Sequence, residues 1–179
     1  MEGLMRLKAM AKINLGLDVL GKREDGYHEV RMIMQTIRMY DILDIRKTKR
    51  PGIVLTTNLP FIPTDQRNLV YKAAQMLMEE FDVEEGLSIK LRKFIPVAAG
   101  MAGGSSDAAA AFVGVNRMFH LGLTEEQLME RAVKVGADVP YCIMRGTALA
   151  EGIGEKLTRL PEVPKCYVLI GKPGINVST

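Results

Sequence analysis

Residues 96–113 read P-V-A-A-G-M-A-G-G-S-S-D-A-A-A-A-F-V, a glycine-rich loop followed by a segment that favours a helix. Gly100, Gly103 and Gly104 have no side chains, so the backbone can adopt positive φ angles and approach another group closely. Residues 105–107 offer N-cap side chains, and the alanines after them are good helix formers. The loop is therefore expected to lead into a helix N-terminus.

Such a junction suits a phosphate group. Free backbone N–H groups and the positive end of the helix dipole attract anions, and the hydroxyls of Ser105 and Ser106 can add hydrogen bonds or face a metal ion. The residues alone leave a second interpretation open, in which the glycines only form a turn and the serines only cap the helix. No Lys-Ser or Lys-Thr follows Gly104, and the spacing does not give G-x-G-x-x-G, so neither the Walker loop nor the dinucleotide fingerprint applies.

The composition indicates a globular chain with one domain. Its 179 residues are 47% hydrophobic and 25% charged, which is enough for one well-packed core. The net charge of +3 is too small to indicate nucleic-acid binding without a local patch, and the one basic run, at residues 46–50, is expected at a solvated hairpin end. We therefore expect no nucleic-acid partner.

The cysteines and histidines give no sign of a metal centre. Cys142 and Cys166 lie far apart and form no C-x-x-C pair, so a reducing compartment fits better than a disulfide framework or a zinc site. His28 and His120 are isolated in sequence, and the metal ligands stay unassigned. The sequence has no apolar run of membrane-spanning length and no signal-peptide core, so we expect a cytoplasmic protein without a membrane partner.

Apolar residues recur at every second position from Leu4 to Leu20, which is the period of a strand. Lys12 and Asn14 share one face of that strand as polar groups among apolar ones. The pattern alone favours a solvent-facing strand edge for both. Asp138 follows a helix-ending glycine in G-A-D-V-P, and its position alone favours a local bond between its side chain and the backbone.

The rest of the chain predicts further strands and three helices. After a turn at 21–26, strands are expected at Val30–Tyr40, Ile42–Arg46, Ile53–Thr57, Leu87–Leu91, Gly146–Glu151 and Lys165–Ile170, with a link at Asp41. Helices are expected after Asp65 or Asn68, after residues 105–107, and from a capping box of Thr124 and Gln127 to Gly136. The first strands are expected to form an antiparallel meander.

Three separate motifs, in this order, resemble the GHMP small-molecule kinases. They are A-K-I-N-L at residues 11–15, the loop from Pro96, and G-A-D-V-P from Gly136. Within that superfamily, D-G-Y-H-E at residues 25–29 resembles the kinases of the non-mevalonate isoprenoid pathway, and the resemblance covers residues 5–179. It implies an α+β fold in which a mixed or antiparallel sheet carries packed helices, similar to domain 2 of ribosomal protein S5.

The same resemblance implies the domain organisation. Residues 1–164 would form the ATP-binding N-terminal domain, and residues 165–179 would begin a C-terminal domain whose remainder is absent from this sequence. That remainder would carry a late glycine-rich motif and an aromatic residue that helps to hold a cytosine ring.

The activity implied by the resemblance is ATP-dependent phosphorylation of the 2-hydroxyl of 4-diphosphocytidyl-2-C-methyl-D-erythritol, with ATP and Mg²⁺ as cofactors. Asp138 would be the general base, and Lys12 would keep it ionised and lower the pKa of the hydroxyl. Asn14 would hydrogen-bond the acceptor, Tyr27 would stack on the cytosine, and His28 would bind its polar edge. The ATP-binding residues would be Pro96, Val97, Ala98, Ala99, Gly100, Met101, Ala102, Gly103, Gly104, Ser105 and Ser106, with Met101 in place of the commoner leucine.

Other functions stay open at this point. A GHMP kinase for mevalonate or homoserine would share the three motifs, although the Tyr27-His28 pair has no evident use with a small aliphatic alcohol. A non-catalytic nucleic-acid module would also fit an S5-like domain, but it requires a basic, aromatic surface. The chain could also be a half that folds and binds ATP without turnover. The sequence assigns neither an oligomeric state nor a role for Glu151.

Overall fold

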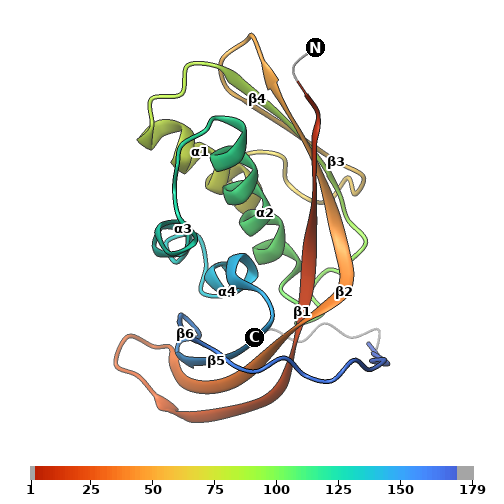
Figure 1. Ribbon diagram of the computed structural model, residues 1–179, viewed down its shortest axis with the longest axis vertical. Coiled ribbons are helices and arrows are strands. Elements are labelled where there is room, and N and C mark those ends of the chain that lie inside the picture. The colour runs from red at the N-terminus through yellow and green to blue at the C-terminus, as the bar shows by residue number, and fades with distance from the viewer. Residues whose placement is uncertain (1–2, 173–179) are drawn as a thin grey trace.

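The computed structural model describes residues 3–172, in which helices cover one face of a curved sheet (Figure 1). The strands are β1 (Met5–Lys22), β2 (His28–Thr48), β3 (Ile53–Thr57), β4 (Gly86–Arg92), β5 (Thr147–Gly152) and β6 (Lys156–Arg159). The helices are α1 (Leu69–Glu80), α2 (Gly103–Met118), α3 (Glu125–Ala132) and α4 (Val139–Met144). Within the described residues, no helix is long and apolar enough to cross a membrane.

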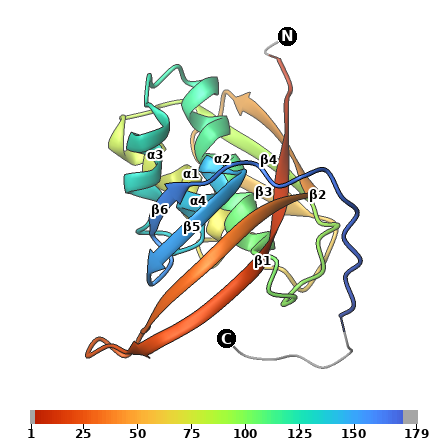
Figure 2. The ribbon, with the colours of Figure 1, turned by 60° about the horizontal axis from the view of Figure 1, so that its bottom comes forward.

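The long strand β2 organises the sheet. Along one edge it pairs antiparallel with β1, and the β1–β2 hairpin extends away from the helices (Figure 2). Its other edge is shared, because residues 30–35 pair with β5 and residues 42–48 pair with β4. β3 joins β4 in parallel and β6 joins β5 antiparallel, so the expected mixed sheet is confirmed.

Two details of the expected sheet are wrong. The first strands do not form a meander, because β4 lies between β2 and β3 in the sheet. β2 also continues through Asp41, where a link was expected. The irregularity at that position is in the pairing instead, since Met10 pairs with Tyr40 whereas Lys12 pairs with Thr36. A bulge of this kind bends a strand and re-aims its side chains.

The core lies between the sheet and the helices, and α2 is packed most closely. Its small residues, among them Ala108 and Ala111, are fully buried. A Cβ atom at Gly114 would lie 2.4 Å from Ile45 Cδ1 and 2.8 Å from Leu7 Cδ1. Glycine at this position therefore lets the helix backbone approach both β1 and β2.

Helix starts were predicted where a local hydrogen bond sets them. Asn68, one of the two expected caps, accepts a hydrogen bond from the Val70 N–H at 2.9 Å. Thr124 and Gln127 form the expected capping box at α3, but this helix ends at Ala132 and not at Gly136. The expected caps of α2 are wrong, because Ala102 is its N-cap and residues 105–107 lie inside the helix.

The end of the described chain also differs from expectation. Residues 165–170 form no strand, and the last strand is β6, which was not predicted. α4 was missed as well. It is only six residues long and begins directly after Asp138, so hydrophobic periodicity had little length in which to show.

Candidate active site

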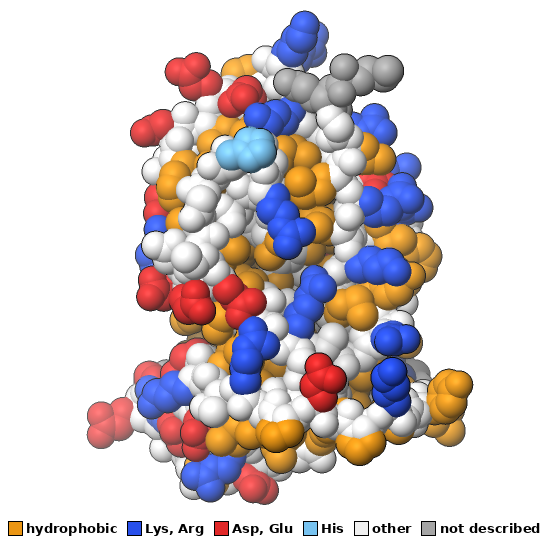
Figure 3. All heavy atoms as spheres, in the orientation of Figure 1, with side chains coloured by type: hydrophobic (Ala, Val, Ile, Leu, Met, Phe, Trp, Pro, Cys, Tyr) orange, Lys and Arg blue, Asp and Glu red, His pale blue; other side chains and the backbone are white. Residues whose placement is uncertain are grey.

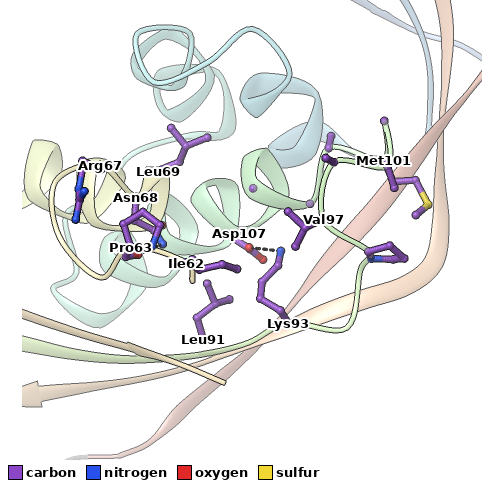
Figure 4. Close-up of a pocket in the computed structure, with 17 residues that line it drawn as sticks. Ile62, Pro63, Arg67, Asn68, Leu69, Leu91, Lys93, Val97, Met101 and Asp107 are labelled. Carbon is purple, nitrogen blue, oxygen red and sulfur yellow. Dashed lines mark hydrogen bonds and ion pairs between the residues drawn. The ribbon is translucent and has the colours of Figure 1, made fainter. Parts of the chain in front are cut away.

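A pocket of about 350 Å³ lies beside the glycine-rich loop. Residues 96–104 form one wall, and the segment before α1 forms the other, with Ile62, Pro63 and Arg67 (Figure 4). Asn68 holds this second wall in place, because its side-chain amide donates to the Pro63 carbonyl at 2.7 Å while its oxygen caps α1. The pocket therefore lies between the segments that lead into the N-terminal ends of α1 and α2.

Of the three glycines at which positive φ was expected, only Gly100 has it, because Gly103 and Gly104 lie inside α2. Gly100 has a φ of 70°, and the non-glycine residues Ala98 and Ala102 also have positive φ, at 53° and 51°. Left-handed alanines cost about 1–2 kcal/mol each, so the surrounding structure must hold the loop in this form. Ala102 offers no side chain to cap α2, which leaves the first N–H groups of that helix available to a ligand.

Two hydrogen bonds fasten the loop to β1. The Lys12 backbone N–H donates to the Met101 carbonyl at 3.2 Å, and the Ser106 hydroxyl donates to the Met10 carbonyl at 2.6 Å. Ser106 is buried and its proton is already engaged, whereas Ser105 is partly exposed. Of the two serines, Ser105 has the hydroxyl that is free to reach a ligand.

Lys12 and Asp138 lie next to each other at this junction. Lys12 is only 5% exposed, and its Nζ lies 3.1 Å from Asn14 Oδ1 and 3.8 Å from Asp138 Oδ2. The expected solvent-facing position of Lys12 is therefore wrong. Asp138 makes no side-chain capping bond to α4, so its expected local turn is also wrong, and its side chain is 33% exposed. Its carboxylate thus has a cationic neighbour and remains open to a ligand.

A buried ion cluster, which was not predicted from the sequence, lies next to the loop and holds its first residues in place. Lys93 Nζ bonds Asp107 Oδ2 at 2.6 Å and also bonds Asp41 (Figure 4 shows the Lys93–Asp107 pair). Asp41 in turn accepts the backbone N–H groups of Phe94 and Ile95, where the chain leaves β4 for the loop. All three charged side chains are buried, so the cluster joins β2, the residue after β4 and the N-terminal half of α2.

The cluster has two carboxylates for one ammonium group. Burial raises the pKa of Asp107 well above its usual value, and the negative charge of Asp41 raises it further, although Lys93 acts in the opposite direction. Asp107 Oδ1 is buried without a hydrogen-bond partner within the described residues. A proton held by Asp107 would relieve the excess of negative charge under the loop.

Tyr27 and His28 lie far along the chain from this junction. They follow the hairpin turn, where Tyr27 is 60% exposed and His28 pairs with Lys22. The stretch of β1 from Lys12 to Lys22 corresponds to roughly 30 Å of strand. The structure therefore brings Lys12, Asn14 and Asp138 together beside the loop and leaves the two rings on the hairpin.

Metal ligands are not evident in the part of the chain that the structure describes. Among residues 3–172, no group of three or more His, Cys, Asp and Glu side chains could hold a metal ion.

The fold and the loop match those of a known class of protein domain. Residues 68–146 match the family model described as GHMP kinases N terminal domain. The fold also matches the homoserine kinase from Cytophaga hutchinsonii, with a TM-score of 0.71 at 19% identity over 90% of this chain and 53% of that one. The chain has the fold of a GHMP-kinase N-terminal domain, and the expected α+β class is confirmed.

More similar relatives share one name, 4-diphosphocytidyl-2-C-methyl-D-erythritol kinase. The relative from Lachnospira eligens is 58% identical, over 98% of this chain and 61% of its own length. The relative from Caldicellulosiruptor bescii is 55% identical, with the same coverage of 98% and 61%. A crystal structure of 4-(cytidine 5'-diphospho)-2C-methyl-D-erythritol kinase is 35% identical with a TM-score of 0.76, covering 87% of this chain and 55% of that one.

These matches confirm the resemblance to the N-terminal portion of this kinase. The resemblance covers only part of that kinase, because the chain spans 61% of the length of the Lachnospira eligens relative.

Proposed function

We propose that this chain is the N-terminal, nucleotide-binding part of an ATP-dependent kinase acting on the 2-hydroxyl of 4-diphosphocytidyl-2-C-methyl-D-erythritol. The observation that carries the proposal is the Lys12–Asp138 pair beside the glycine-rich loop at the start of α2. The names of the relatives above support the choice of acceptor over mevalonate or homoserine. Residues 1–164 would be the N-terminal domain, and residues 165–179 would lead into the next.

The residues of the loop fit the phosphates of ATP. ATP with Mg²⁺ supplies the phosphoryl group and the positive charge that offsets the negative charge on the phosphates. Residues 96–104 line the pocket with backbone and small side chains, and the open N–H groups of α2 point into a ready anion site. Ser105 can add its hydroxyl, while Ser106 holds the loop to β1.

Asp138 and Lys12 would have different roles at the acceptor hydroxyl. Asp138 would take the proton from the 2-hydroxyl as the hydroxyl oxygen bonds to phosphorus and the bond to the ADP oxygen breaks. The Lys12 ammonium, 3.8 Å from that carboxylate, lowers the pKa of a substrate hydroxyl placed between them. Asn14 accepts a hydrogen bond from Lys12, which holds the ammonium in place, and can also contact the acceptor.

The hairpin would bind the cytidyl end of the substrate. The exposed Tyr27 ring offers a stacking surface, and His28 offers polar atoms for the edge of the base. Their separation from Lys12 along β1 suits a substrate whose base and reacting hydroxyl are joined by a diphosphate and a sugar.

We also infer a cytoplasmic location from the two free cysteines, Cys142 and Cys166.

The test is a coupled assay of ADP release with ATP, Mg²⁺ and the cytidyl substrate. It compares this chain with a version continued by the C-terminal part of the Lachnospira eligens relative. Mevalonate and homoserine serve as control acceptors. We expect turnover only by the continued chain and only with the cytidyl substrate. Turnover with mevalonate or homoserine, or none with the cytidyl substrate, would overturn the proposal.

A further inference from the structure

A second pocket, of about 530 Å³, lies between β1 and the helices α2, α3 and α4. Arg117 at the C-terminal end of α2 and Arg145 directly after α4 both line it. Gly103 and Arg117 are separated by about 20 Å of helix, so this pocket is distinct from the one beside the glycine-rich loop. The proposed kinase reaction uses none of its side chains.

The charged groups around this pocket leave two guanidinium groups without an acidic partner. Arg6 is held by Asp44, and the Lys8 ammonium lies over the Tyr40 ring, 4.2 Å from its centre. Glu125, the acidic residue at the rim, is paired with Arg159. Among residues 3–172, no carboxylate lies within 4.0 Å of Arg117 or Arg145.

Arg145 is held in this position despite unfavourable surroundings. Its φ is 59°, a conformation that costs a non-glycine residue about 1–3 kcal/mol. Although Arg145 is exposed as a whole, partial burial lowers the pKa of its guanidinium, and the nearby positive charge of Arg117 lowers it further. One of its nitrogens donates to the Lys8 carbonyl at 2.9 Å, which fixes the side chain against β1. An anion would relieve the repulsion between the two arginines.

The rest of the pocket is partly apolar. Leu7, Val113 and Leu123 line it and are only partly buried, above the buried side chain of Ile143. Figure 3 shows the same face, on which Lys and Arg side chains follow one another down the middle with apolar side chains between them. The pocket thus offers a cationic rim and apolar surface that a ligand can cover.

We propose that this pocket binds an organic phosphate, with its phosphate between Arg117 and Arg145 and a short apolar part against Leu7 and Val113. Guanidinium groups bind phosphate oxygens through paired N–H donors, which a lone ammonium group cannot do. The apolar part adds the burial of surface that is otherwise exposed to water. An organic phosphate should therefore bind more tightly than inorganic phosphate.

The test is isothermal titration calorimetry of the 179-residue chain with n-butyl phosphate and, separately, with inorganic phosphate. Arg117→Gln is the main variant. Arg46→Gln is its matched control, because Arg46 is also exposed, forms no ion pair within the described residues and lies on β2. Circular dichroism confirms that both variants are folded. Arg145→Lys, which keeps the charge and loses the guanidinium fork, is a second variant.

We expect Arg117→Gln to weaken n-butyl phosphate binding about tenfold or more, the size of a lost charge-assisted bond of roughly 1.4 kcal/mol. Arg145→Lys should weaken it less, and Arg46→Gln should leave it unchanged. Equal effects of Arg117→Gln and Arg46→Gln would overturn the proposal, because the phosphate would then bind elsewhere, such as at the glycine-rich loop. Absence of saturable binding, or equal affinity for inorganic phosphate, would also overturn it.

Discussion

Asp138 is the residue on which turnover should depend most. Its carboxylate has Lys12 as a neighbour and no capping bond, so Asp138→Asn removes the base while keeping its shape. In the chain continued to the relatives' length, we expect kcat to fall about a hundredfold or more, the usual size of a general-base effect. The KM for ATP should stay nearly constant. Steady-state kinetics measure both, and unchanged turnover would remove Asp138 from this role.

Tyr27 should affect one substrate and not the other. Its ring is 60% exposed, so Tyr27→Ala should leave the unfolding temperature unchanged. If the ring stacks on cytosine, the KM for the cytidyl substrate should rise roughly tenfold, since one base stack contributes about 1–3 kcal/mol. The KM for ATP should not change, because the loop lies elsewhere. An equal rise in both KM values would contradict the stacking role.

Lys93 should stabilise the fold, because its ammonium group pairs with two buried carboxylates. Lys93→Met leaves Asp41 and Asp107 buried with no cation, and we expect it to lower the free energy of unfolding by about 3–5 kcal/mol. Urea unfolding measures the loss. Lys90→Met is the control, because Lys90 lies on β4, three residues before Lys93, is exposed and forms no ion pair within the described residues. Similar losses in both variants would contradict the role of the cluster.

Asp107 should also set a pH dependence. Because its pKa is raised in the folded state, that state binds a proton more tightly than the unfolded chain, whose Asp has a pKa of about 3.9. Its contribution to stability is therefore largest at low pH and is lost as the pH rises from about 3.9 through the folded pKa. Asp107→Asn should flatten the fall in stability over that range. Urea unfolding of both proteins at several pH values tests this, and an unchanged slope would contradict it.

Among the secondary-structure elements, those set by local signals could be predicted from sequence. The Asn68 cap and the Thr124–Gln127 box lie within a few residues of their partners, and both were predicted. α4 and β6 are too short to show a periodic pattern, and their positions depend on packing against α3 and β5. The predicted strand at residues 165–170 has the right residue types, but it has no partner strand in the described structure.

In the candidate site too, residues that lie in short motifs could be predicted from the sequence, whereas residues joined by long-range contacts could not. The loop, Lys12 and Asp138 were found because each lies in a short motif that resembles a family. The Lys93–Asp41 pair joins residues 52 positions apart, and nothing in the sequence near either residue marks it. Ser106 was expected at a phosphate, but its hydroxyl bonds Met10, 96 positions earlier. Contacts of this range depend on the fold and leave no local pattern.

The close contact of α2 with the sheet gives a prediction for one glycine. Gly114→Ala would place its Cβ 2.4 Å from Ile45 Cδ1, so the helix or the strand must shift. We expect a loss of about 1–3 kcal/mol in the free energy of unfolding, typical of an overpacked core. Gly16→Ala is the matched control, because nothing lies within 4 Å of its Cβ position. Denaturant unfolding compares the two, and equal effects would contradict the packing argument.

In the whole molecule, the second half of β1 is the most exposed part of the sheet. All of β1 pairs with β2 alone, and beyond residue 13 its side chains are exposed, including Leu15, Leu17 and Val19 at 52%, 50% and 59%. An unpaired strand edge with apolar side chains invites pairing with another chain. We therefore expect the 179-residue chain to self-associate as its concentration rises.

Leu17→Lys should reduce that association without changing stability, because Leu17 is half-exposed and a lysine on a strand edge opposes pairing. Sedimentation velocity over a range of concentrations should show a smaller share of dimers and larger species. Thr56→Lys is the control, since it adds the same charge to an exposed position of β3, at another edge of the sheet. If both variants reduce association equally, net charge is the cause. If neither does, the edge of β1 is not the contact surface.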